Sequence, residues 1–318
     1  MAKSLLKDAD GRSPLAGPDE LPLLGRRIIV TAPRQYSQKL CAKLINAGAR
    51  PLVVPAVQIT ALAGEDAAQA RHAAKALGSQ LRQLLAQPPP TSPPSPFVFS
   101  HIAFTSRNGI FAFLDGLSAQ LGGVEPAVAW LHRSGLRLCA LGADGEVLTD
   151  RGLRVHVSPP EASTLGLVRE LEARGEARGA RVLCPVPVVS GGLVEPPVVP
   201  RFLQALEDAG AEAVRLPAYR TTLGCSPAGC EAERAALQAG AVSAVAFSST
   251  AEGLVQLMGG TAAFAEAVVR HGVVLAAHGP YTAEGVRGVT GLPVPVVSRA
   301  FSTFDGLVAA LEAHFGGL

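Results

Sequence analysis

The sequence lacks the charge pattern of a nucleic-acid-binding protein. Its 318 residues carry 28 Lys and Arg against 26 Asp and Glu, a net charge of +2, with no basic block or aromatic-interleaved stripe. No apolar run reaches the roughly 20 residues that a membrane-spanning helix needs, so we expect no membrane span. A small molecule is the expected partner, and any binding of anions must depend on local groups.

The sequence also lacks the short motifs of several enzyme classes. No GxGxxG, GxxxxGK[ST], HExxH or GxSxG pattern occurs, which disfavours a nicotinamide-dependent or phosphoryl-transfer enzyme. The cysteines are odd in number and no histidine cluster accompanies them, so we expect no metal site and a reducing compartment. They are Cys41, Cys139, Cys184, Cys225 and Cys230, and the last two are spaced too widely for CxxC chemistry.

The length fits two domains, because roughly 100–200 residues form one domain. Hydrophobic residues make up 48% of the chain and charged residues 17%, which is ample material for buried cores. Residues 1–24 contain acids and no apolar core, so we expect a disordered leader and no secretory signal. Residues 88–96 (PPPTSPPSP) are expected to form a surface loop.

Four units of the chain occur twice in the same relative order. Residues 102–106 (IAFTS) and 245–249 (VAFSS) are apolar runs that stop at paired hydroxyls and precede a helical pattern. The other pairs are 47–49 with 209–211, 142–153 with 279–292, and 157–164 with 297–303. The pattern predicts two similar α/β domains with a ligand between them, although a generic alternation of strands and helices remains the alternative.

Candidate binding residues lie where a predicted strand ends and a helix begins. Such loops offer hydroxyl caps and free backbone N–H groups, and open α/β sheets bind anions there. Arg34 and Arg107 could add contacts to carboxylates. Ordinary helix caps would explain any single loop, but four at equivalent places favour a binding cleft. The candidates are Arg34, Thr105, Ser106, Arg107, Asn108, Ser248, Ser249, Gly279, Tyr281 and Thr282.

Tyr219 is one of only three tyrosines, and it lies in a β-type run that passes between the two predicted halves. A phenol at that place could donate a proton into a cleft. The alternative is an interfacial aromatic ring whose hydroxyl group contacts water.

Eight ordered strings resemble the uroporphyrinogen-III synthase family, from residue 25 to the C-terminus apart from the Pro-rich insertion. LVEPPVVP and LGAD (141–144) are most similar to versions from photosynthetic lineages. The strings are RIIVTAPR (27–34), IAFTSRNGI (102–110), RVLCPVP (181–187), LVEPPVVPRFL (193–203), LPAYRTT (216–222), AFSSTAEGL (246–254), HGPYTAEGV (278–286) and FSTFDGLV (301–308).

The resemblance implies two flavodoxin-like α/β domains with parallel sheets, joined by a two-strand connection and separated by a cleft. The chain would cross between them at Pro55–Thr60 and Pro217–Thr222. One domain would then contain residues 25–57 and 222–318, and the other residues 58–221. Each domain would hold one copy of every repeated unit.

The resemblance also implies a cofactor-independent hydro-lyase that cyclises hydroxymethylbilane to uroporphyrinogen III, with loss of water and inversion of ring D. Tyr219 matches the family's cleft tyrosine, which is the favoured proton donor. Thr105, Ser106, Ser248, Ser249, Gly279 and Thr282 match positions lining the cleft. The loop Gly142–Gly145 departs from the family pattern because Asp144 and Gly145 occur where many members have a threonine.

The resemblance also gives expectations for the oligomeric state, the location and the partners of the protein. The resemblance favours a monomer in the plastid stroma, with cytoplasm as the fallback, and transient contact with neighbouring pathway enzymes. A two-lobed binder of a tetrapyrrole or another polycarboxylate, without catalytic activity, is the competing hypothesis because a fold does not dictate a function.

Overall fold

The computed structural model describes residues 21–62, 68–88, 98–248, 251–300 and 303–316. The chain divides into a first unit, residues 1–58 with 223–318, and a second unit, residues 59–222. The predicted boundaries lay one residue away from each of these divisions. No helix in the described ranges is long and apolar enough to cross a membrane. Nearly all of the Pro-rich segment and residues 1–20 of the predicted leader lie outside the described residues.

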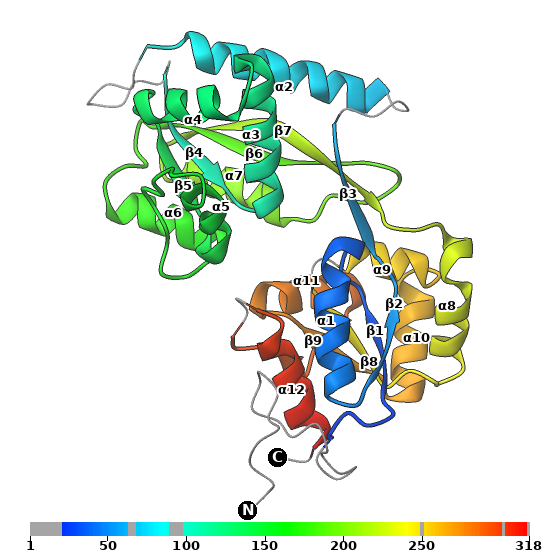
Figure 1. Ribbon diagram of the computed structural model, residues 1–318. Helices are drawn as coiled ribbons and strands as arrows, with labels where there is room; N and C mark the ends of the chain where they lie inside the picture. Colours follow the sequence, from blue (N-terminus) through cyan, green and yellow to red (C-terminus); the bar gives the residue numbers. More distant parts are fainter. Residues whose placement is uncertain (1–20, 63–67, 89–97, 249–250, 301–302, 317–318) are drawn as a thin grey trace, which may run out of the picture. The chain divides into compact units, whose positions relative to one another are not determined.

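The first unit contains a parallel sheet of five strands in the order β10-β9-β8-β1-β2 (Figure 1). Its strands are β1 (Arg27–Val30), β2 (Arg50–Val53), β8 (Ala244–Phe247), β9 (Val274–Ala277) and β10 (Val296–Val297). Alternate side chains of each strand enter two separate apolar clusters, one on each face of the sheet.

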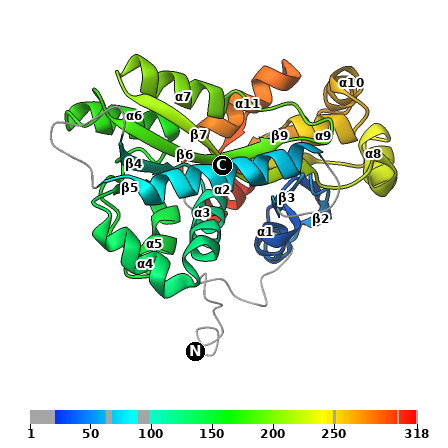
Figure 2. The same ribbon diagram turned by 90° about the horizontal axis from the view of Figure 1, so that it is seen from above.

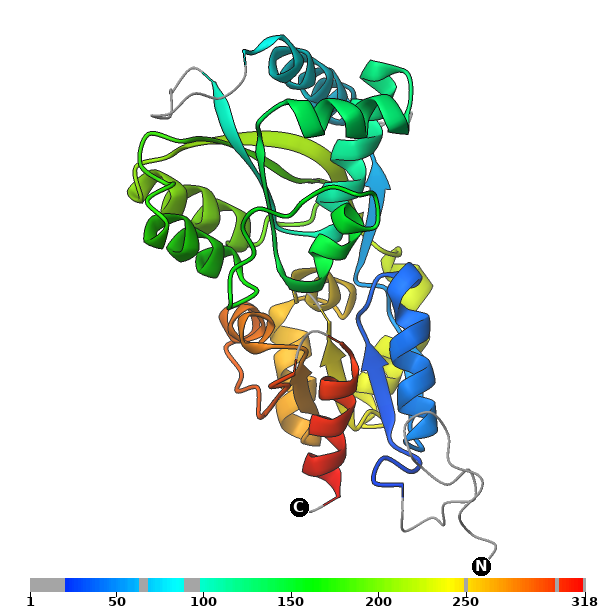
Figure 3. The same cartoon turned by 60° about the vertical axis from the view of Figure 1, so that its left-hand side comes forward.

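Helices α1 (Arg34–Asn46) and α12 (Asp305–Phe315) cover one face of this sheet and lie side by side (Figures 1 and 3). The other face is covered by α8 (Glu231–Gln238), α9 (Glu252–Leu257), α10 (Thr261–His271) and α11 (Pro280–Thr290). The short helix η3 (Pro227–Cys230) leads into α8. The predicted leader, residues 1–24, was too long at its C-terminal end, because Leu23 is fully buried in the cluster beneath α1 and α12.

The second unit contains five strands in the order β3-β7-β6-β4-β5. They are β3 (Val57–Ala61), β4 (Phe99–Phe104), β5 (Arg137–Ala140), β6 (Arg181–Val189) and β7 (Glu212–Leu223). The strands β5, β4, β6 and β7 are parallel. The chain passes from one unit to the other within β3 and again within β7.

The helices of the second unit form a layer on each side of its sheet, as Figure 2 shows. One layer consists of α2 (Ala68–Ala86), α3 (Arg107–Leu121), α4 (Val124–Arg133), η2 (Gly142–Gly145) and α5 (Glu146–Thr149). The other consists of α6 (Thr164–Ala173) and α7 (Val198–Asp208). Ser106 and Ser163 cap α3 and α6 by accepting a backbone N–H within the first turn.

The two sheets are permuted copies of one arrangement, which confirms the predicted duplication. The first sheet has the order β2-β1-β8-β9-β10, and the second has β7-β6-β4-β5 followed by a bridge from Cys139 to Val157. When the strands of the first unit are numbered 1 to 5 in chain order, its sheet has the order 2-1-3-4-5, which is the order of flavodoxin-like folds. The predicted fold class, two similar flavodoxin-like domains with parallel sheets, is therefore confirmed.

Candidate functional site

Most predicted site residues follow the carboxyl ends of strands, whereas Tyr219 lies within β7. The second unit holds Thr105, Ser106, Arg107, Asn108 and Tyr219, and the first unit holds Arg34, Ser248, Gly279, Tyr281 and Thr282. Ser249 lies outside the described residues. Each group is described within its own unit.

Ser106 joins the start of α3 to β7. Its backbone is extended (φ −160°, ψ 153°), and its Oγ accepts a hydrogen bond from the backbone N–H of Gly109 at 3.1 Å. The same Oγ lies 3.0 Å from the phenolic oxygen of Tyr219. A Cβ at Gly109 would lie 2.9 Å from the carbonyl oxygen of Pro185, so only glycine lets this helical turn pack against β6. The serine is thus a helix cap and a partner of the tyrosine at once.

A β-bulge directs Tyr219 towards Ser106. The register of β6 with β7 pairs Val186 with Pro217 and then Pro187 with Tyr219, so Ala218 has no partner in β6. Side chains of a regular strand alternate between the two faces of the sheet. Without the extra residue, Tyr219 would therefore lie on the same face as Pro217. With it, the ring lies on the sheet face that α3 covers, and the side chain is only 8% exposed.

Arg107 contacts the loop that follows β5. Its Nη2 donates to the carbonyl oxygen of Ala143 at 3.1 Å, and its Nε lies 3.4 Å from Oδ1 of Asp144. The other carboxylate oxygen of Asp144 accepts the backbone N–H of Arg107 at 3.1 Å. Burial raises the pKa of Asp144, and the charge and hydrogen bonds of Arg107 oppose that rise. The sequence had marked Asp144 only as a departure from a family pattern.

Among the described residues, none of the three helices that follow strand ends of the first unit has a hydroxyl side chain at its N-cap position. Helices α1, α9 and α11 begin after Pro33, Ala251 and Gly279, and none of these makes a side-chain cap. Thr31 instead joins two strands, because its fully buried hydroxyl donates to Ala246 and accepts the backbone N–H of Ser248 at 3.3 Å. Backbone carbonyl oxygens act at these helix starts: Pro33 accepts the N–H groups of Tyr36 and Ser37, and Gly279 accepts that of Ala283.

The remaining candidates of the first unit differ in exposure. Arg34 is the first residue of α1 and is exposed, and Tyr281 is 39% exposed in the first turn of α11. Thr282 is partly buried beside it, and Gly279 is buried in an extended conformation. The hydroxyl oxygen of Ser248 is buried and has no hydrogen-bond partner among the described residues. Arg34 and Tyr281 are thus the exposed side chains among these candidates.

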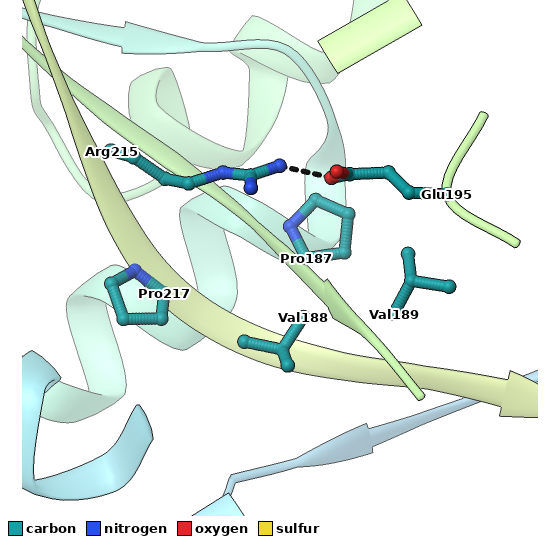
Figure 4. A pocket seen from close by; sticks show the side chains of 6 residues that line it. All are labelled: Pro187, Val188, Val189, Glu195, Arg215 and Pro217. Atoms are coloured by element: carbon teal, nitrogen blue, oxygen red, sulfur yellow. Dashed lines mark hydrogen bonds and ion pairs between the residues drawn. The ribbon is translucent and has the colours of Figure 1, made fainter. Parts of the chain in front are cut away.

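A small pocket of the second unit lies elsewhere (Figure 4). It has a volume of about 210 Å³, and an ion pair between Arg215 and Glu195 forms one wall. Pro217 of β7 and Val188 of β6 line it. None of the residues that line this pocket is a predicted site residue. Among the described residues, no three His, Cys, Asp or Glu side chains converge as metal ligands would.

Comparison with known proteins gives one family. The family model described as uroporphyrinogen-III synthase HemD matches residues 38–309. A triple-mutant selenomethionine form of uroporphyrinogen III synthase from the extremely thermophilic bacterium Thermus thermophilus is 19% identical, with a TM-score of 0.55. That likeness covers 91% of this chain and 97% of the bacterial chain.

The wild-type bacterial enzyme in another crystal form is 22% identical with a TM-score of 0.43, over 91% of this chain and 99% of that chain. The structural likeness at these identities concerns the fold alone, and the match of the family model carries the assignment. No curated protein matches the chain.

Proposed function

This chain belongs to the uroporphyrinogen-III synthase family, and we propose that Tyr219 and Ser106 form the catalytic pair of its active site. The family's members are lyases of tetrapyrrole biosynthesis that act without a cofactor. Their reaction cyclises hydroxymethylbilane to uroporphyrinogen III with loss of water and inversion of ring D. The observation that carries the proposal is the hydrogen bond between Tyr219 and Ser106 at the end of β4.

The substrate brings much of the reactivity itself. Loss of its terminal hydroxyl group gives an electrophilic azafulvene, and attack by the substituted position of ring D forms a spiro intermediate that fragments and recloses. The protein must therefore protonate the leaving group and hold a flexible chain in one geometry. Tyr219 donates the proton to the departing hydroxyl, which leaves as water.

Ser106 is suited to orient the phenol and to stabilise the phenolate that remains. Its hydroxyl oxygen accepts the Gly109 N–H at 3.1 Å, so its own proton is available to the phenolate oxygen 3.0 Å away. The buried position of Tyr219 strengthens this interaction because water competes little for the phenolic oxygen.

Binding of the substrate rests on dispersed contacts with its acetate and propionate groups. Arg107 is held at Nη2 and Nε by Ala143 and Asp144, which leaves Nη1 for a substrate carboxylate. In the first unit, the exposed Arg34 at the start of α1 is a further candidate donor to a carboxylate. This arrangement is consistent with the small net charge of +2.

An inactive polycarboxylate binder is the alternative, and the Asp144 carboxylate beside Arg107 is the observation that favours it. Negative charge next to a cation weakens its attraction for a substrate anion. Incubation of the purified protein with fresh hydroxymethylbilane, followed by oxidation and separation of the uroporphyrin isomers, decides between the two. Catalysis gives excess type III isomer, whereas a binder leaves the spontaneous type I isomer.

We further propose that the protein acts as a monomer in the plastid stroma, within chlorophyll and haem synthesis, and contacts neighbouring pathway enzymes transiently. The strings LVEPPVVP and LGAD, similar to those of photosynthetic lineages, support the location. The location is tested by a fluorescent fusion, with cytoplasm as the competing result. Light scattering of the purified protein tests the monomer.

A further inference from the structure

Two cysteines bracket the turn that connects β7 to α8. Cys225 follows the end of β7 at Leu223, and Cys230 is the last residue of η3. Ser226 fixes the turn, because its hydroxyl and its carbonyl oxygen accept the N–H of Gly229 at 3.2 and 2.9 Å. The turn brings the two thiols close enough for Cys230 to raise the pKa of Cys225. Both cysteines also contact the same apolar cluster of the first unit.

The two thiols differ in their access to solvent. Cys230 is 2% exposed, and its single S–H is shared among the carbonyl oxygens of Ser226, Pro227 and Leu257, which lie 3.7, 3.5 and 3.7 Å from Sγ. Cys225 is only half-buried, and the guanidinium of Arg34 lies near enough to stabilise its thiolate. Burial nevertheless raises the pKa of Cys225 to about 11, and the neighbouring Cys230 contributes to this rise as a smaller cause. Cys225 is therefore the accessible thiol of the pair, and it ionises more readily as the pH rises.

We propose that Cys225 and Cys230 form a reversible intramolecular disulfide that adjusts the end of helix α9. The oxidant is a low-molecular-weight disulfide of the glutathione class. The Cys225 thiolate attacks one of its sulfur atoms and releases one thiol, and the Cys230 thiolate then attacks Cys225 of the mixed disulfide and releases the second. The two cysteines lose two electrons and two protons, and the reagent is reduced to two thiols.

Oxidation removes a hydrogen bond at the carboxyl end of α9. The Cys230 S–H is a donor to the carbonyl oxygen of Leu257, the last residue of that helix, at 3.7 Å, and in the described residues only the shorter bond from Arg234 Nη1 at 3.3 Å then remains on this carbonyl. Helix α9 follows the loop of Ser248. Loss of one hydrogen bond changes an equilibrium constant by about two- to tenfold. We expect a rise of this size in KM for hydroxymethylbilane. This second consequence rests on the proposed function, whereas disulfide formation does not.

The test uses the whole protein in buffers of reduced and oxidised glutathione. Free thiols are trapped by alkylation, and tryptic cleavage after Arg220 and Arg234 releases both cysteines in one peptide. From the oxidised wild type we expect this peptide without alkyl groups and two hydrogen atoms lighter than the reduced peptide. The disulfide should form faster at alkaline pH, and dithiothreitol should reverse it. Cys225→Ser removes the product, and Cys41→Ser, which changes another half-buried thiol of the first unit, leaves it.

Two alkylated thiols in that peptide after oxidation, or a glutathione adduct on Cys225 alone, overturn the disulfide. If the disulfide forms but KM for hydroxymethylbilane is equal in the oxidised and reduced protein, the adjustment of α9 is overturned. A protein that never produces the type III isomer refutes the proposed function instead, and the peptide analysis still decides the disulfide.

Discussion

Replacing Tyr219 by phenylalanine removes one oxygen atom and separates the catalytic role of the phenol from its structural role. The hydroxyl lies 3.0 Å from Ser106 Oγ in a side chain that is 8% exposed. Loss of a buried hydrogen bond costs about 0.5–1.5 kcal/mol of unfolding free energy. For a unit of this size, 1 kcal/mol lowers the melting temperature by roughly 2–4 °C.

The kinetic effect of the same substitution should be much larger. A positioned proton donor contributes about 10²–10⁴-fold to a rate, so kcat for formation of the type III isomer should fall by that factor. KM should change little, because the ring still fills its place beside α3. The assay measures initial rates of type III formation together with the melting temperature of each variant.

Ser106→Ala is the matched control. It leaves the phenol in place but removes the cap of α3, and the loss of a helix cap costs typically about 1 kcal/mol. The control should therefore lose as much stability as Tyr219→Phe, or more, while it retains more of kcat. If Tyr219→Phe keeps kcat within about twofold of the wild type, the phenol is not the proton donor and the proposed catalytic pair is wrong.

Three further substitutions test other parts of the structure. Arg107→Ala should raise KM for hydroxymethylbilane several-fold and leave kcat unchanged in steady-state kinetics, and an unchanged KM would show that Arg107 does not bind a substrate carboxylate. Gly253→Ala should lower the free energy of unfolding by about 1–3 kcal/mol because the new Cβ would lie 2.3 Å from the carbonyl oxygen of Ala56, whereas Gly285→Ala, with nothing within 4 Å, should not. Burial lowers the pKa of His101, so the unfolded chain takes up that proton at a higher pH, and stability should fall as pH drops below about 6.5. His101→Gln should lessen this fall in urea titrations at neutral pH and at about pH 5.5, and an unchanged slope would contradict the assignment.

The repeated units could be predicted from the sequence because the pattern of each strand and helix is local. The runs at 102–106 and 245–249 became β4 and β8, which occupy equivalent places in the two sheets. The repeat at Val157 was also present, although it forms an isolated bridge where the first unit has the strand β10. Hydrophobic periodicity determines such elements, and a duplicated pattern predicts a duplicated sheet.

The contacts of the site could not be predicted in the same way. The pairing of Tyr219 with Ser106 depends on one extra residue, Ala218, that shifts the alternation of β7. The partners of Arg107 depend on Asp144, which lies 37 positions away and reaches it through the packing of the second sheet. The role of Thr31 was also not predicted, because its buried hydroxyl contacts backbone groups at Ala246 and Ser248, more than 200 positions along the chain. Each of these contacts is tertiary, and no local pattern encodes it.

The most direct test of the account is the ratio of uroporphyrin isomers that the purified, metal-free chain yields from fresh hydroxymethylbilane as the protein concentration rises. The account predicts that the rate of type III formation increases in proportion to the protein while the spontaneous type I product declines. A product that remains type I at every protein concentration would contradict it.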